Sequence, residues 1–139
     1  MIYVGVTAEN GGAFAMAYGM NGDIEVKSFD AGAFIQALSP KTPMDIRCVV
    51  EMPEEGIIER AVKKPNPAVV ATTFCQARGI PFMYVKTGSL RRAYDMNPER
   101  SMTEECRIRY PEHELRGTPR EQEAAASALL LARYARRYL

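Results

Sequence analysis

The last stretch of the chain, residues 118–139, constrains the fold more than any other segment. Its sequence, TPREQEAAASALLLARYARRYL, begins with Thr118 as an N-cap, and Glu121 follows three residues later. This spacing is a capping box, so we expect a helix that begins at Thr118. The run of alanines favours helix strongly and lets it lie close against a sheet. Glu123 and Ser127 are four residues apart and therefore share one face of this helix.

The first 28 residues have the period of strands. Apolar and small or polar residues alternate over residues 2–7, a second strand pattern covers residues 12–20, and a third covers residues 23–28. Asn21-Gly22 between the last two is a hairpin signal. The sequence therefore predicts a three-stranded antiparallel meander.

Strands and helices alternate after the meander. Helices are expected after the caps Asp30 and Asn66, with Gly79 ending the second, and two buried strands are expected over residues 46–50 and 81–86. Residues 55–64 have a helical bias, and two more short helices are expected in residues 86–96 and from Asn97-Pro98. This order predicts an α/β fold with a mixed five-stranded sheet and helices on its faces, in a single domain of residues 1–139.

Composition excludes several functional classes. No apolar run approaches the roughly 20 residues that span a bilayer, so we expect no membrane segment, and the start of the chain has no secretory pattern, so we expect a cytoplasmic protein. A net charge of +1 gives no global attraction for nucleic acid. The three cysteines are far apart and are expected to be buried thiols. The single histidine, His113, is expected in a surface loop, and zinc is not expected.

Acidic residues stand where strand ends and a helix start should meet. If the first strand pairs with the strand of residues 46–50, Thr7 and Glu9 lie near Glu51, and the last helix presents Glu123 and Ser127 to both. Carboxylates gathered in this way are what two-metal phosphodiester hydrolysis requires, because their oxygens hold two Mg²⁺ ions about 4 Å apart.

Five segments in order resemble one known family. YVGVTAENGGAFA is similar to the opening GIDPG…GAIA hairpin of the RuvC-type Holliday-junction resolvases, and CVVEMP is similar to their VVIEKP strand. GIPFMYVKTGSLRRAY resembles the family's segment giP…V.p..WK, and SMTEECRIRYP resembles its helix ending in LFP. QEAAASALLLARYARR resembles its motif HDGRADALLLAEYG. The resemblance covers almost the whole chain and is to compact phage and poxvirus-like members of this RNase H-like family.

The resemblance also implies a degenerate active site. The first and last catalytic aspartates of the family fall on Thr7 and Ser127, and only Glu51 and Glu123 keep carboxylates at matching positions. Glu9 is a possible partial substitute for the first aspartate. Because threonine and serine are neutral, Mg²⁺ binding by Glu51 and Glu123 should be much weaker than in active relatives.

Three functions follow as alternatives. The first is a catalytically impaired RuvC-like protein that binds branched nucleic acid or a protein partner. The second is an active Mg²⁺-dependent junction endonuclease that uses Glu9, Glu51 and Glu123, and the third is an unrelated α/β interaction module. Phosphate contacts are expected from four basic residues: Lys63, Lys64, Arg91 and Arg92.

Assembly is also predicted from the resemblance. Resolvases of this family act as homodimers on a two-fold symmetric junction, so a homodimer is expected here. The helix that begins after Asn66 offers either a pairing surface or a face buried under a neighbouring loop, since Val69, Phe74 and Ala77 can lie on one apolar side.

Overall fold

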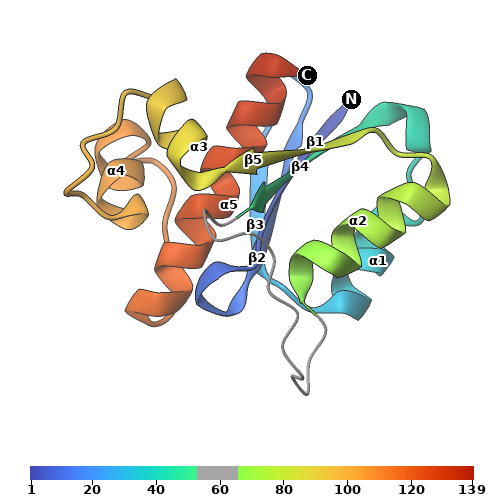
Figure 1. Ribbon diagram of the computed structural model, residues 1–139, viewed down its shortest axis with the longest axis horizontal. Coiled ribbons are helices and arrows are strands. Elements are labelled where there is room, and N and C mark those ends of the chain that lie inside the picture. Colours follow the sequence, from blue (N-terminus) through green and yellow to red (C-terminus); the bar gives the residue numbers. More distant parts are fainter. Residues whose placement is uncertain (53–65) are drawn as a thin grey trace.

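The computed structural model describes residues 1–52 and 66–139 and contains a mixed five-stranded sheet with helices on its faces (Figure 1). The strand order is β3-β2-β1-β4-β5. β1 pairs antiparallel with β2 and parallel with β4, β2 pairs antiparallel with β3, and β4 pairs parallel with β5. The predicted α/β fold and its antiparallel meander are therefore confirmed. The strands are β1 (Ile2–Thr7), β2 (Ala13–Tyr18), β3 (Ile24–Ser28), β4 (Ile46–Met52) and β5 (Phe82–Lys86).

Helices follow the strands in the predicted alternation. They are α1 (Ala31–Leu38), α2 (Pro67–Arg78), α3 (Thr87–Ala93), α4 (Met102–Arg109) and α5 (Pro119–Tyr138), with short 3₁₀ helices η1 (Glu9–Gly11) and η2 (Pro43–Asp45). Among these described segments, no helix is both long and apolar enough to cross a lipid bilayer. The helical bias of residues 55–64 lies outside the described residues.

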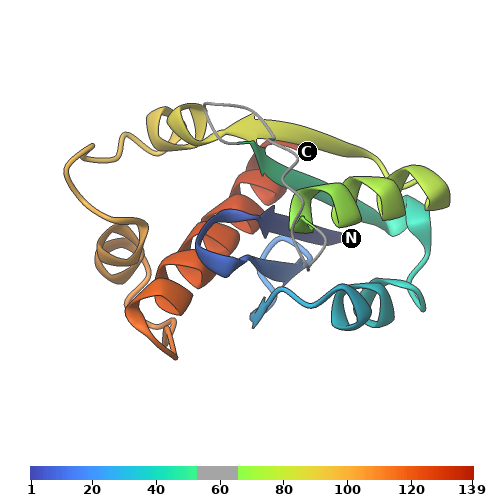
Figure 2. The same cartoon turned by 60° about the horizontal axis from the view of Figure 1, so that its bottom comes forward.

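The sheet separates two hydrophobic clusters. Figure 2 shows α5 on one side of the sheet and α1 and α2 on the other. Along β1, Tyr3 faces the cluster formed with α5, whereas Val4 and Val6 face the cluster formed with α1 and α2. This alternation is the normal consequence of the two-residue period of a strand. Thr7 shares the parity of Tyr3 and therefore lies on the α5 face of the sheet.

α5 lies very close to the sheet at Gly5. A Cβ atom placed on this glycine would stand 2.4 Å from the backbone N of Ala132 and 2.5 Å from the carbonyl O of Ala128. Only a residue without a side chain permits this approach. The predicted capping box is present as well: the N–H of Glu121 donates to Thr118 Oγ1, and the N–H of Thr118 donates to Glu121 Oε1, each over 3.2 Å.

The start predicted for α4, at Asn97-Pro98, was wrong. Asn97 closes a turn instead, because its side chain accepts the N–H of Glu99 over 2.9 Å. α4 begins at Met102, where Ser101 is the N-cap and its hydroxyl accepts the N–H of Glu104 over 3.1 Å. An asparagine before a proline fits a turn as well as a helix start, so the dipeptide alone does not separate the two.

The face of α2 that packs on the sheet is made of small residues. Ala68, Ala71 and Cys75 are fully buried, whereas Val69 is 39% exposed. The small residues face the sheet because they let the helix approach β4 and β1 closely, and the larger Val69 remains at the surface.

The three cysteines are buried in the fold, whereas the single histidine is partly exposed. All three cysteines are buried free thiols, as predicted. His113 is not a simple surface residue, because it is only partly exposed and its Nε2 lies 3.3 Å from Arg133 Nη2. Burial is the main cause that lowers the pKa of His113, and the neighbouring charge of Arg133 lowers it further.

Candidate functional site

Glu51 is the centre of the candidate site. It ends the buried part of β4 on the α5 face and is only 2% exposed. Its Oε1 accepts the hydroxyl of Thr7 over 2.6 Å, and its Oε2 accepts the hydroxyl of Thr87 over 3.0 Å. The parallel register places Val6 beside Val50 and Glu51 beside Val85, so the ends of β1, β4 and β5 bring the three side chains together.

The environment of Glu51 opposes its ionisation. Burial is the largest effect and raises the pKa of this carboxyl above its usual value of 4.5, whereas the two threonine hydrogen bonds lower it. The charge of Glu9 raises the same pKa slightly and that of Arg91 lowers it. The net direction is upward, so the carboxyl holds its proton to higher pH than an exposed glutamate does.

The carboxylate of Glu123, predicted to face Glu51, is bonded to the start of α4. Oε2 accepts the N–H of Met102 over 3.0 Å, and Oε1 accepts both the N–H and the hydroxyl of Thr103, each over 2.8 Å. The third N–H of α4, that of Glu104, donates to the Ser101 hydroxyl, so the first three N–H groups of this helix all have partners. Glu123 therefore acts as a cap for α4 and ties the start of that helix to α5.

Glu9 lies at the rim of the candidate site. It is the first residue of η1 and is exposed, and its backbone N–H donates to Thr7 Oγ1 over 3.1 Å. Its charge acts on Glu51 in the direction that raises the pKa of that carboxyl. Within residues 1–52 and 66–139, no three acidic, cysteine or histidine side chains are gathered so that they could hold a metal ion. The predicted grouping of Glu9, Glu51 and Glu123 around a metal is therefore not formed in this structure.

Ser127 is buried on the side of α5 that faces the sheet. α5 runs antiparallel to β1, because Ala128 and Ala132 lie over Gly5, whereas Arg136, further along the helix, donates to the carbonyl of Gly22 beyond the Ile2–Tyr18 end of the β1–β2 pair. Thr7 is two residues beyond Gly5 on the same face, so the turn of α5 that carries Ser127 lies towards Thr7. Thr7 and Ser127, the two neutral residues that the sequence resemblance aligns with aspartates, therefore belong to one region.

Basic residues follow β5 at the same end of the sheet. Arg91 and Arg92 are in the last turn of α3, and Arg91 is close enough to affect the ionisation of Glu51. Arg91 Nη1 also donates to the carbonyl of Arg100 over 3.1 Å, and Arg92 Nη2 donates to the hydroxyl of Ser89 over 3.2 Å. Lys63 and Lys64, predicted to contact phosphates, lie outside the described residues.

Sequence reasoning missed two residues of this region. Thr87 follows Val85 by two positions, so the strand period could have placed it on the same face as Glu51. Thr103 is the second residue of α4, and its role depended on the correct start of that helix at Ser101. No local signal links Thr103 to Glu123, because α5 is a separate element.

Comparison with solved structures identifies the fold. A Thermus thermophilus RuvC in complex with a Holliday junction substrate superposes with a TM-score of 0.56 at 14% identity, covering 99% of this chain and 96% of that chain. A second Thermus thermophilus RuvC structure gives a TM-score of 0.50, also at 14% identity and with the same coverage. No protein-family model and no curated protein matches the sequence. The chain therefore has the RNase H-like fold of RuvC.

The donor atoms at the site do not fit a pair of Mg²⁺ ions. Among the residues that the structure describes, Glu51 is the one carboxylate at its centre, and both of its oxygens already accept hydroxyl hydrogen bonds. Glu123 is held by α4, and Thr7 and Ser127 carry no charge. Two divalent ions need several oxygen ligands with compensating negative charge at about 2.1 Å, and this arrangement supplies too little of that charge.

Proposed function

We propose that this protein binds branched nucleic acid through a RuvC-like fold and has lost most or all of the ability to cut it. The observation that carries the second half of the proposal is the position of Glu123, whose carboxylate caps α4 with three hydrogen bonds. A carboxylate used in this way is not free to join Glu51 around a metal. The likeness to RuvC bound to a Holliday junction supports the choice of a branched substrate.

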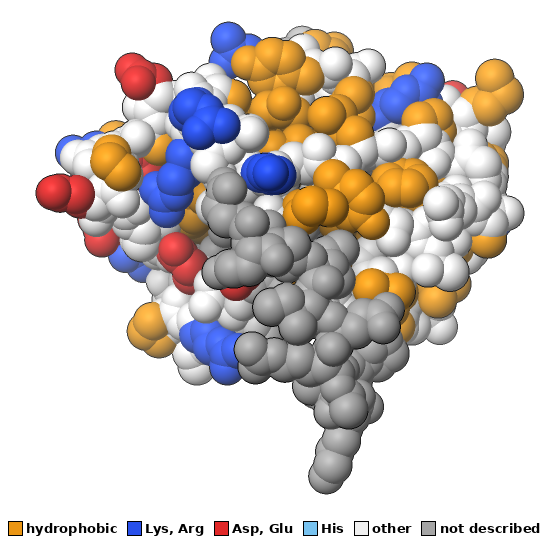
Figure 3. Space-filling model, viewed as in Figure 1, with side chains coloured by type: hydrophobic (Ala, Val, Ile, Leu, Met, Phe, Trp, Pro, Cys, Tyr) orange, Lys and Arg blue, Asp and Glu red, His pale blue; other side chains and the backbone are white. Residues whose placement is uncertain are grey.

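The proposed contact surface lies at the β5 edge of the sheet. Lys86 and Arg92 are exposed, and Arg91 is partly exposed beside them. Figure 3 shows Lys and Arg side chains over the region of α3 and β5, next to a group of hydrophobic side chains. Tyr84 on β5 is 39% exposed and adds an aromatic surface on which a base can stack. Positive charge and an exposed ring together suit a nucleic-acid backbone and an unpaired base.

Binding can be tested by fluorescence anisotropy with a labelled four-way junction in the presence of a chelator. We expect the junction to bind more tightly than a linear duplex of equal length, and binding should weaken steeply as salt rises. Replacing Arg91 and Arg92 by alanine should weaken binding at least tenfold. Arg116→Ala is the matched control, because Arg116 is exposed near β3 at the opposite edge of the sheet. Equal effects of the two changes, or no junction binding at low salt, would refute the proposed surface.

Loss of cleavage needs a separate measurement. The wild-type protein should leave a four-way junction intact in Mg²⁺ under conditions where it binds that junction. Replacing Thr7 and Ser127 together by aspartate should raise Mg²⁺ affinity in calorimetry, because both carboxylates would be added beside Glu51. Circular dichroism would confirm that the variant is folded. Mg²⁺-dependent cutting by the wild-type protein would instead make it a working endonuclease.

The homodimer predicted from the sequence remains part of this proposal. A two-fold symmetric junction is matched by a two-fold symmetric protein. α2 keeps one large apolar residue at its surface, Val69, so it remains available as a pairing surface. Its neighbours Thr73 and Gln76 are exposed and uncharged, which places no like charges between two copies of this helix.

A further inference from the structure

A different surface carries the stronger case for pairing, namely the free edge of β3. In the β2–β3 ladder the N–H of Tyr18 donates to the carbonyl of Asp23 over 3.1 Å, and the N–H of Phe29 donates to the carbonyl of Gly12 over 3.1 Å. Hydrogen-bonded and non-hydrogen-bonded pairs alternate along an antiparallel ladder. Glu25 and Lys27 therefore bond to β2, whereas three residues direct their N–H and C=O groups outward: Ile24, Val26 and Ser28.

These outward groups have no backbone partner in the described part of the chain, since no bond joins them to another segment. The two faces of the strand differ. Ile24 and Val26 pack towards α5, whereas Glu25 and Lys27 are exposed on the other face. An unpaired strand edge of this kind is a template for another strand.

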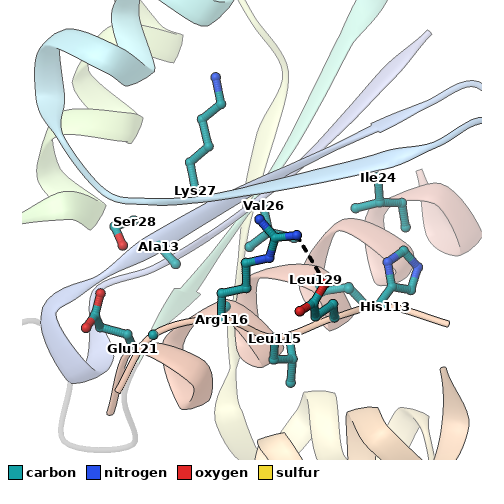
Figure 4. A pocket seen from close by; sticks show the side chains of 13 residues that line it. Ala13, Ile24, Val26, Lys27, Ser28, His113, Leu115, Arg116, Glu121 and Leu129 are labelled. Carbon is teal, nitrogen blue, oxygen red and sulfur yellow. Dashed lines mark hydrogen bonds and ion pairs between the residues drawn. The ribbon is translucent and has the colours of Figure 1, made fainter. Parts of the chain in front are cut away.

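A groove of about 480 Å³ runs beside this edge on the α5 face. It is lined on one side by Ile24, Val26 and Ser28, and on the other by residues 113–117, with Leu129 of α5 beneath. In Figure 4, Lys27 points away from the groove, and Arg116 lies below the strand on the groove side. The space can therefore take apolar side chains from an added strand without displacing the charged ones on β3.

We propose that the occupant of this edge is β3 of a second copy of the chain, paired antiparallel about a two-fold axis at Val26. In this register Val26 faces the partner's Val26, and Ile24 faces the partner's Ser28. These are the residues with outward groups, so each pair can exchange both N–H···O bonds. The two sheets would join into one, and the partner's Ile24 would enter the Ser28 end of the groove.

The charges on β3 select this register. With the axis at Val26, Glu25 of each copy lies opposite the partner's Lys27, so both cross-strand pairs have opposite charges. Moving the axis to Ile24 would place Glu25 opposite Asp23, two like charges. Moving it to Ser28 would place Lys27 opposite Phe29 and remove both ion pairs. Of these three registers, only the one with its axis at Val26 both pairs the outward backbone groups and places opposite charges across from each other. This pairing gives a surface to the homodimer of the proposed function, and its test needs no nucleic acid.

Charge reversal tests the register. Glu25→Lys and Lys27→Glu each place like charges across the interface twice, so each should raise the dimer dissociation constant about tenfold or more. The double variant restores opposite charges and should return the constant close to the wild-type value. Sedimentation equilibrium over a range of micromolar concentrations measures all four proteins. Because both side chains are exposed, the substitutions should leave the fold intact, and circular dichroism checks this.

A second variant tests the backbone bonds. Val26→Pro removes an N–H that faces outward and leaves the bonds of β3 to β2 in place, since proline is tolerated at such an edge position. It should abolish dimers, whereas Val26→Thr keeps the N–H and should retain them. In the wild-type protein, hydrogen exchange at the Val26 amide should slow as concentration rises. The Lys27 amide, which bonds to β2, should be protected at every concentration.

Three results would overturn the proposal. A wild-type protein that stays monomeric at high micromolar concentration has no such interface. A dimer that is unaffected by either charge reversal and by Val26→Pro pairs through another surface, such as the outer face of α2. A double charge variant that stays as weak as the single ones would show that Glu25 and Lys27 do not face each other.

Discussion

Replacing Glu123 by alanine separates a structural role of this residue from a metal-binding role by the sign of the stability change. The Glu123 carboxylate accepts the N–H groups of Met102 and Thr103 and the hydroxyl of Thr103. Hydrogen bonds to a charged group contribute about 1.5–3 kcal/mol when buried, and loss of a helix cap costs about 1–2 kcal/mol. Because Glu123 is partly exposed, we expect a loss of about 2 kcal/mol.

Thermal unfolding followed by circular dichroism measures this loss. For a chain of this size, about 2 kcal/mol lowers the midpoint by about 5–10 °C. Glu104→Ala is the matched control, because Glu104 is in the same turn of α4 and its carboxylate makes no hydrogen bond within the described residues. It should change stability by less than about 0.5 kcal/mol. If Glu123 instead belonged to a cluster of metal-binding carboxylates, its removal would relieve repulsion in the metal-free protein. An unchanged or raised midpoint would therefore refute the capping role.

Other perturbations test the packing of α5 and the burial of Glu51. Gly5→Ala should cost about 3 kcal/mol in chemical denaturation, because the new Cβ would stand 2.4 Å from the backbone of Ala132 and α5 would have to move. Gly32→Ala in α1 is its control and should be neutral or stabilising by up to about 1 kcal/mol, and equal losses would contradict the close approach. The raised pKa of Glu51 means that the folded state holds this proton more tightly than the unfolded chain does. Its contribution to unfolding free energy should therefore fall as pH rises above 4.5, and Glu51→Gln should lack this fall when stability is compared across pH. Thr118→Ala should cost about 1 kcal/mol by loss of the α5 cap, and an unchanged unfolding midpoint would argue against that cap.

Local signals were sufficient for most of the fold. The alternation along β1 and the Asn21-Gly22 turn predicted the meander, and Asp30, Asn66 and Thr118 each cap the helix that follows them. These features depend on contacts within a few residues, so the sequence contains them directly. The pairing of β1 with β4 was also expected, since a strand that follows the first helix commonly returns beside the first strand.

The candidate site was only partly predictable. Thr7 and Glu51 were expected to lie close together, and their hydroxyl and carboxylate oxygens are 2.6 Å apart. Thr87 joined them because β5 pairs with β4 in a register that brings its end beside Glu51. The register of two parallel strands is set by packing on both faces, and that information is spread over residues far apart in the chain.

What the tertiary structure alone decided is the partner of Glu123. Helical periodicity correctly places Glu123 at the start of α5, but it does not determine which neighbour the carboxylate meets. α4 begins at Met102 and packs against α5. The N–H groups of its first turn have no partner within the helix, lie next to Glu123 and attract its negative charge. The sequence by itself thus determined the strands, the capped helices and the order of the fold. The role of the Glu123 carboxylate depended on the packing of two helices, because a side chain bonds to the groups that the folded chain places beside it.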